Sequence, residues 1–145
     1  MPTAERTITI AAPLETVFAF FTTPENDLLW REELVEATPE GPIGLNAIVR
    51  QQVSAPVIGE VAADTQFTAW DPPHGYSFKV IAGPVRPEGT ITFAPVGEGT
   101  SVTFKLSVDI RGPQKFLLTK PTQNSMNATV AALDKVKTIL ETGQQ

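Results

Sequence analysis

The sequence predicts an α+β fold in which a curved antiparallel β-sheet wraps around a long C-terminal α-helix. Thr7–Ile10 alternates polar and apolar residues, which is typical of a strand with one buried face. After residue 42 the hydrophobic period is two through several segments, and after Pro113 it becomes helical. With 145 residues, of which 41% are hydrophobic, the chain is expected to form one domain over residues 1–145.

Two short helices are predicted directly after the first strand. Apolar residues recur at helical spacing through Leu14–Phe21, and Pro13 stands where the first turn of a helix tolerates a missing N–H. Thr23 is expected to cap the second helix, with Pro24 in its first turn and Trp30 at its end.

The middle of the chain is predicted to form the sheet, because turn-forming Pro, Gly and Asp residues separate segments of period two. The last segment alternates most regularly, which favours an antiparallel sheet with one buried and one solvated face. The predicted strands are Leu45–Ser54, Glu60–Trp70, Tyr76–Ala82, Glu88–Ala94 and Thr100–Ile110.

The C-terminal helix is predicted over Asn124–Leu140, where apolar residues form a stripe at steps of three and four. Pro121 is expected either to kink this helix or to mark its start. One helix fills only part of the concave face of a curved sheet. The remaining space is expected to form a ligand cavity.

Composition excludes several classes of function. The chain has no cysteine, which excludes disulfide scaffolds, zinc–thiolate sites and cysteine nucleophiles. Its net charge of -5 disfavours nucleic acid as a partner. No apolar run approaches the ~20 residues of a membrane span, and no secretory signal is recognisable, so we expect a cytoplasmic protein without an integral membrane segment.

Polar residues with possible chemical roles are expected to be solvated. His74 is the only histidine and lies in a Pro-Pro-His-Gly turn, which favours neither a catalytic triad nor a metal site. We expect no metal and no cofactor. The acidic residues have polar neighbours and are expected on outer faces, although Glu32 or Glu33 could reach a cavity entrance; they are Glu32, Glu33, Glu36, Glu60 and Asp64.

Several stretches carry a resemblance to a known family. They are Ile10–Phe18, Thr23–Asn26 followed by Trp30, Ala69–Pro73, Glu88–Pro95 and Gly99–Thr100. On these stretches the chain resembles the START-like (SRPBCC) superfamily, with the helix-grip fold of the birch pollen allergen. Within it, the chain is most similar to bacterial polyketide cyclase/dehydrase-type proteins. The resemblance implies a deep pocket for apolar, often polycyclic or acyl, ligands, and no catalytic motif of the family transfers residue by residue.

Candidate ligand-binding residues are those expected to face this pocket. Trp30 lies where the family places an aromatic residue facing the cavity. Gln51 interrupts an apolar strand face, and a buried amide needs a hydrogen-bond partner. The full set is Trp30, Gln51, Thr65, Phe67, Tyr76, Phe78, Phe93, Met126 and Asn127. Catalytic residues are not identified by the sequence.

Three functions remain open at this point. The first is binding of an apolar or aromatic small molecule by an enzyme similar to polyketide cyclases and dehydrases, acting by positioning with acid/base help. The second is a non-catalytic carrier or sensor of a hydrophobic ligand. The third is a co-chaperone-like interaction module. The protein is expected to be a monomer or a homodimer.

Overall fold

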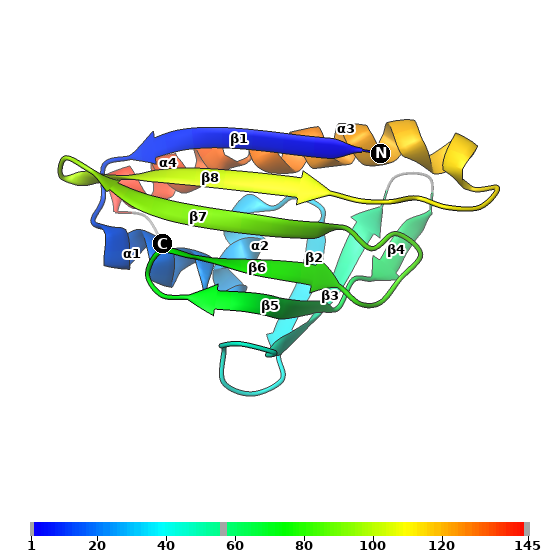
Figure 1. The fold of residues 1–145 in the computed structure, drawn as a ribbon, viewed down its shortest axis with the longest axis horizontal. Coiled ribbons are helices and arrows are strands. Elements are labelled where there is room, and N and C mark those ends of the chain that lie inside the picture. Colours follow the sequence, from blue (N-terminus) through cyan, green and yellow to red (C-terminus); the bar gives the residue numbers. More distant parts are fainter. Residues whose placement is uncertain (1, 56–57, 144–145) are drawn as a thin grey trace.

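The structure is a computed structural model that describes residues 2–55 and 58–143. Strand β1 (Thr3–Ile10) precedes helix α1 (Leu14–Phe21), a 3₁₀ turn η1 (Pro24–Asn26) and helix α2 (Asp27–Trp30). Seven strands follow: β2 (Leu34–Pro39), β3 (Ile48–Ala55), β4 (Gly59–Ala62), β5 (Thr65–Asp71), β6 (Gly75–Val80), β7 (Glu88–Val96) and β8 (Gly99–Ser107). Helices α3 (Lys115–Ala131) and α4 (Leu133–Thr142) end the fold (Figure 1).

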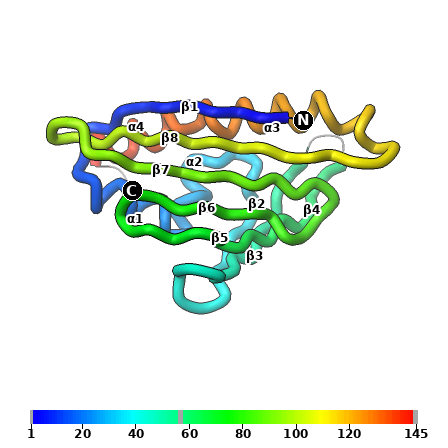
Figure 2. The backbone as a smooth tube through the Cα atoms, in the orientation of Figure 1, coloured from blue at the N-terminus to red at the C-terminus, as the bar shows by residue number. Residues whose placement is uncertain are grey.

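The strands form one antiparallel sheet in the order β1-β8-β7-β6-β5-β3-β2, with β4 paired to β3. The sheet curls into a half-barrel, and α3 and α4 run along its concave face behind β1 and β8 (Figures 1 and 2). This arrangement confirms the predicted α+β helix-grip fold. Within the described residues, no helix is long and apolar enough to cross a membrane.

Strand β2 was not predicted, and its irregular register explains why. It pairs with β3, but the register shifts between Leu34 and Glu36. The buried residues Leu34 and Ala37 are consequently three positions apart, so the segment lacks the period of two by which strands are recognised.

The predicted strand Glu60–Trp70 is two strands, β4 and β5, which pair with different parts of β3. The chain turns between them at Ala63 and Asp64. The main-chain N–H of Gln51 donates to Oδ1 of Asp64 at 3.1 Å, and its carbonyl accepts the N–H of Ala63 at 2.8 Å. The main chain stays hydrogen-bonded to β3 through this turn. Buried and less buried residues continue to alternate from Ala63 to Phe67, so the sequence pattern shows no break between the two strands.

The C-terminal helical region begins earlier than predicted. Pro121 lies inside α3 and does not start it, and the helix is interrupted at Ala132 instead. The early turns of α3 expose Phe116 and Leu117, whose exposed fractions are 95% and 71%. These exposed apolar residues do not belong to the apolar stripe that starts at Met126. The helical spacing of that stripe therefore did not predict the first turns of α3.

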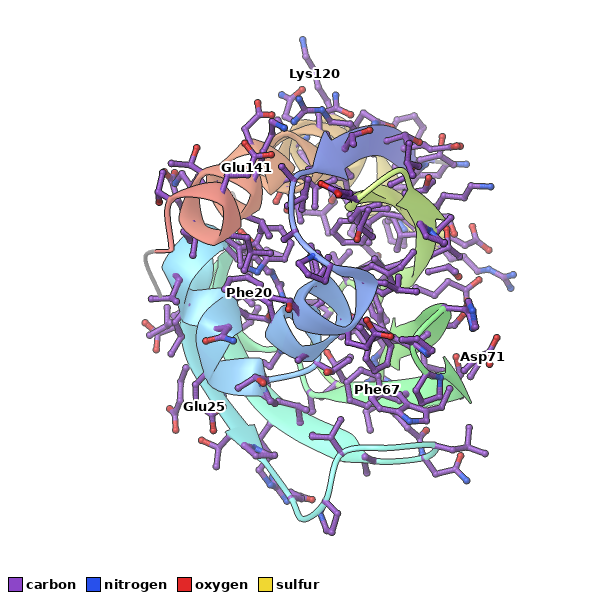
Figure 3. All side chains as sticks on the ribbon, turned by 90° about the vertical axis from the view of Figure 1, so that its left-hand side faces the viewer. Phe20, Glu25, Phe67, Asp71, Lys120 and Glu141 are labelled. Atoms are coloured by element: carbon purple, nitrogen blue, oxygen red, sulfur yellow. The ribbon has the colours of Figure 1, made fainter. Side chains whose placement is uncertain are left out.

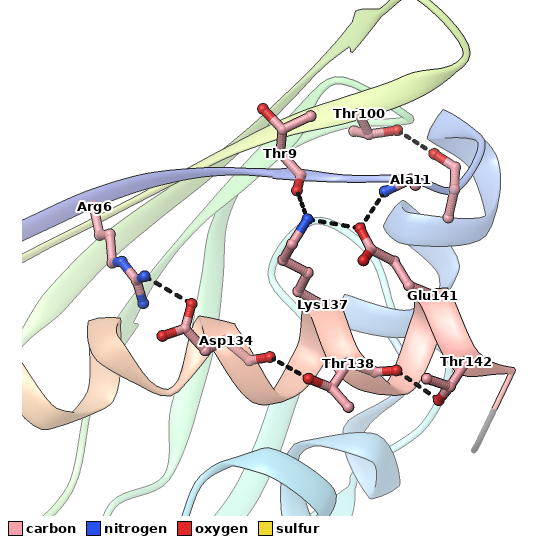
Figure 4. A network of polar contacts seen from close by, with 10 residues as sticks. Arg6, Thr9, Ala11, Thr100, Asp134, Lys137, Thr138, Glu141 and Thr142 are labelled. Atoms are coloured by element: carbon pink, nitrogen blue, oxygen red, sulfur yellow. Dashed lines mark hydrogen bonds and ion pairs between the residues drawn. The ribbon is translucent and has the colours of Figure 1, made fainter.

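A network of hydrogen bonds and ion pairs connects helix α4 to β1 and to Ala11, which follows it (Figure 4). Lys137 Nζ donates to the Thr9 carbonyl at 2.6 Å and to Glu141 Oε2 at 2.7 Å, and this same Oε2 accepts the N–H of Ala11 at 2.7 Å. Arg6 pairs with Asp134 at 2.7 Å. The α4 half of the helical region is thus held against the sheet.

Candidate functional site

A cavity of about 180 Å³ lies between the concave face of the sheet, helix α3 and the segment from α1 to α2. Helix α4 packs directly against the concave face of the sheet and its side chains fill the space there, because Leu133 and Val136 are fully buried. Helix α3 instead presents Thr122, Ser125 and Thr129 toward the cavity. The buried side chains of Leu118 and Met126, from the same helix, line the cavity as well.

Aromatic side chains form much of the cavity wall. Trp30 is 3% exposed and packs edge-on against Phe21 and Phe104, with ring centroids 5.7 and 6.2 Å apart. Phe67 lies in the same way against Tyr76 at 5.4 Å. Figure 3 looks at the molecule from the α1 end and shows α1 inside the open end of the curled sheet. Interlocked rings of this kind make a rigid apolar wall.

The structure brings most of the candidate ligand-binding residues together at this cavity. Those that line it are Trp30, Gln51, Thr65, Phe67, Tyr76, Phe78 and Met126. Their inward direction follows from alternation along the strands and from the apolar stripe of the helix.

Phe93 and Asn127 lie elsewhere. Phe93 is 3% exposed and packs against Phe18 and Phe21, at 5.6 and 5.4 Å between ring centroids, in the solid core under α1. Asn127 is exposed and accepts a hydrogen bond from Gln123 at 2.9 Å. Successive residues of a helix point in directions about 100° apart. Met126 points into the cavity, so Asn127 points away from it.

Asp27, Arg31 and Glu33 form a charged cluster in the cavity wall. The sequence analysis named Glu33 as able to reach the cavity entrance but missed Asp27 and Arg31. Arg31 Nε donates to Oε1 of Glu33 at 2.8 Å, and its Nη1 lies 3.9 Å from Oδ2 of Asp27. The indole N–H of Trp30 donates to Oδ1 of Asp27 at 3.4 Å. The spacing of four residues between Asp27 and Arg31 was the available signal, since it places both on one face of a helix.

Burial and charge act in opposite directions on this cluster. Burial raises the pKa of Asp27 from 3.8 to about 6, although Arg31 and the indole hydrogen bond lower it. Burial alone would lower the pKa of Arg31, but the carboxylates of Glu33 and Asp27 outweigh it, so the guanidinium stays charged. Burial, and then the charge of Asp27, hold the pKa of Tyr76 well above its ordinary value.

Several polar side chains that line the cavity already make hydrogen bonds within the protein. The hydroxyl of Tyr76 donates to the Phe21 carbonyl at 3.3 Å. The hydroxyl of Thr65 is shared between Oε1 of Gln51 at 3.3 Å and the Ala63 carbonyl at 3.0 Å. These bonds hold Tyr76, Thr65 and Gln51 in place. The charged part of the wall is the cluster of Asp27, Arg31 and Glu33.

The other polar candidates lie away from this wall. Glu32 points outward and pairs with Lys135, whereas its neighbour Glu33 lines the cavity. His74 is exposed in the turn between β5 and β6. Among the described residues, no three His, Cys, Asp or Glu side chains converge as a metal site would require.

Comparison with known families agrees with this geometry. The family model described as polyketide cyclase/dehydrase and lipid transport matches residues 1–141. The chain belongs to this family. No curated protein matches the sequence.

Solved structures share the fold of this family member at low sequence identity. The protein TTHA0849 from Thermus thermophilus is 24% identical, with a TM-score of 0.81 over 99% of this chain and 100% of that one. A START superfamily protein from Mycobacterium smegmatis is 15% identical, with a TM-score of 0.75 over 97% of each chain. The di-domain ARO/CYC StfQ of the steffimycin biosynthetic pathway is 10% identical, with a TM-score of 0.75 over 97% of this chain and 51% of that one.

Proposed function

We propose that the protein binds one small, largely apolar molecule, aromatic or similar in shape, inside the cavity beneath α3. The observation that carries this proposal is a largely apolar, partly open cavity of about 180 Å³ with aromatic side chains in its wall. A dry apolar cavity of roughly 150 Å³ already accepts benzene. Burial of a hydrocarbon ring in such a space is favourable because it removes apolar surface from water.

The size of the cavity favours one ring over a fused polycycle. Pockets for drug-sized ligands measure roughly 300–1,000 Å³, and this cavity is smaller, at about 180 Å³. The aromatic contacts of Trp30 with Phe21 and Phe104 oppose enlargement, since moving one ring disturbs its neighbours. We therefore propose monocyclic ligands, a narrower class than the polycyclic ligands that the resemblance implies.

An enzymatic role is the second candidate, and the charged cluster favours it over a purely passive carrier. A carboxyl group whose pKa lies near neutrality can both donate and accept a proton, and Asp27 lies beside the permanently charged Arg31. Cyclisation or dehydration by positioning with acid/base help agrees with the family description. The interaction-module alternative has less support, because the cavity is not collapsed.

Filling the cavity tests the binding proposal. Ser125→Phe places a ring in the space from α3, whereas Ala128→Phe adds the same ring on the exposed face of the same helix. Toluene is the probe, and its binding is followed through the indole N–H resonance of Trp30 and through the melting temperature. We expect Ser125→Phe to weaken toluene binding by about tenfold or more while Ala128→Phe binds like wild type. Equal binding by both variants, or no binding by wild type, would contradict the proposal.

A further inference from the structure

Arg31 keeps hydrogen-bond donors that are directed to no protein acceptor. Its Nε donates to Glu33, but its Nη1 is 3.9 Å from Asp27, which is too long for a hydrogen bond. Among the side-chain hydrogen bonds of residues 2–55 and 58–143, none uses Nη1 or Nη2 of Arg31. The side chain keeps 22% of its surface accessible and lines the cavity. A guanidinium has no acceptor atom, so water or a ligand supplies the acceptors for Nη1 and Nη2, and neither nitrogen is buried without a partner.

The charges around Arg31 select the kind of acceptor. Arg31 already lies between the carboxylates of Asp27 and Glu33. A ligand carboxylate would bring a third acidic group to one guanidinium, which is costly in a site removed from bulk water. A cationic ligand would leave the Nη donors unfilled and would compete with Arg31 for the carboxylates of Asp27 and Glu33. A neutral carbonyl oxygen accepts the hydrogen bonds without adding charge.

The remaining polar groups of the wall do not compete equally for this role. The hydroxyl groups of Tyr76 and Thr65 already donate to main-chain carbonyls. Gln51 accepts from Thr65 through Oε1. Its Nε2 makes no hydrogen bond to the part of the chain that the structure describes, and the same holds for the cavity-lining hydroxyls of Ser54, Thr122 and Ser125. These neutral donors are the alternatives to Arg31, and loss of the carbonyl preference in Arg31→Lys separates them from it.

We propose that Arg31 is the ligand anchor, and that it binds the carbonyl oxygen of a neutral ketone, aldehyde or ester whose hydrocarbon part occupies the aromatic cavity. This rests on the proposed function, because it assigns the polar end of the molecule that the cavity would bind. The Nη donors give the ligand an orientation as well as affinity, since hydrogen bonds from a charged donor are about twice as strong as neutral ones.

Four molecules of nearly the same shape provide the test. Acetophenone carries the carbonyl, α-methylstyrene replaces the oxygen by CH₂, benzoate carries a negative charge and benzamidine a positive charge. In a cavity without an anchor the hydrocarbon binds best, because it loses the least hydration. With Arg31 as anchor, we expect acetophenone to bind wild type about tenfold more tightly than α-methylstyrene, and more tightly than either ion.

Variants identify the donor. Arg31→Lys keeps the positive charge near Asp27 and Glu33 but lacks the planar Nη donors. We expect it to lose the preference for acetophenone while its affinity for α-methylstyrene changes by less than roughly twofold. Gln51→Met should keep the preference. Affinities are measured by calorimetry near neutral pH.

The possible results separate the anchor, the ligand class and the proposed function. If wild type binds α-methylstyrene as tightly as acetophenone, the anchor is wrong and the cavity function stands. If Gln51→Met alone abolishes the preference, the anchor is Gln51 and not Arg31. If an ion binds most tightly, the ligand class is wrong. If none of the four molecules binds, the proposed function fails as well. If Arg31→Lys does not fold, wild type and Gln51→Met still test the proposal: a preference for acetophenone that is absent in wild type, or lost in Gln51→Met, overturns Arg31 as the anchor, and one kept in both supports it.

Discussion

Replacing Asp27 by Asn is expected to stabilise the protein at neutral pH. Burial is the main cause that raises the pKa of Asp27 from 3.8 to about 6. The charged groups that face it are Arg31, which lowers the pKa, and Glu33 and Glu25, which raise it. Because the folded state binds this proton more tightly than the unfolded state, the ionised carboxylate lowers the free energy of unfolding.

The sign and size of the effect follow from the two pKa values of Asp27. Near pH 3 both states are mostly protonated, so the group contributes little. Between 3.8 and about 6 only the folded state retains the proton, and the free energy of unfolding falls by about 1.4 kcal/mol per pH unit as the pH rises. Above about pH 6 the full cost of about 3 kcal/mol is present. Asn is neutral and similar in shape, and its amide oxygen still accepts the indole N–H of Trp30.

Urea unfolding of wild type and Asp27→Asn from about pH 3 to about pH 8, followed by circular dichroism, measures this effect. We expect the two proteins to be similar at the acid end and the variant to be more stable at neutral pH, by up to about 3 kcal/mol. Glu25→Gln is the matched control, and it should act in the same direction but less, because Glu25 is the last of the causes that raise this pKa. If Asp27→Asn is less stable than wild type at every pH, the pair with Arg31 stabilises the ionised carboxylate and the reasoning is refuted.

Three further changes test the packing around the site, each by the melting temperature and urea unfolding. Thr100→Val removes the hydroxyl that donates to the Ala12 carbonyl at 2.8 Å in a fully buried position, and should cost roughly 1–3 kcal/mol; an unchanged stability would contradict this bond. Gly75→Ala places a Cβ 2.7 Å from the main-chain oxygen of Ile91, and should cost roughly 1–3 kcal/mol because a strand must move; a neutral result would mean that the sheet yields freely. Lys137 and the Ala11 N–H lower the pKa of Glu141, so its contribution is present above the ordinary pKa of 4.5 and is lost as the pH falls. Glu141→Gln should therefore lower the melting temperature at neutral pH but not in acid, and an equal loss at both would exclude the ionic origin.

The sequence by itself determined those parts of the fold in which a regular period repeats. Helix α1 has the predicted bounds Leu14–Phe21, because its apolar residues follow helical spacing from a proline start. Strand β8 was recognised from its strict alternation. Strand β2 was not, because its bulge shifts one face by a residue and only its pairing with β3 makes it a strand. Periodicity detects a local pattern, whereas a bulge is defined by the partner strand.

For the site, the sequence determined which side chains of the strands point inward, since alternation sets the face of each residue. Thr65, Phe67 and Tyr76 line the cavity for this reason. The tertiary structure decided that Phe93 belongs to the solid core, because α1 covers its end of β7.

Only the tertiary structure decided the ionisable part of the site. In the sequence, Asp27 and Arg31 read as a charged pair on a short helix, of the kind that is usually solvated. Folding places them in a cavity wall beside Tyr76 from β6, where loss of water raises the pKa of Asp27 to about 6. The pKa of a carboxyl group depends on the surrounding dielectric and on charges from other elements, which are distances in space and not spacings along the chain.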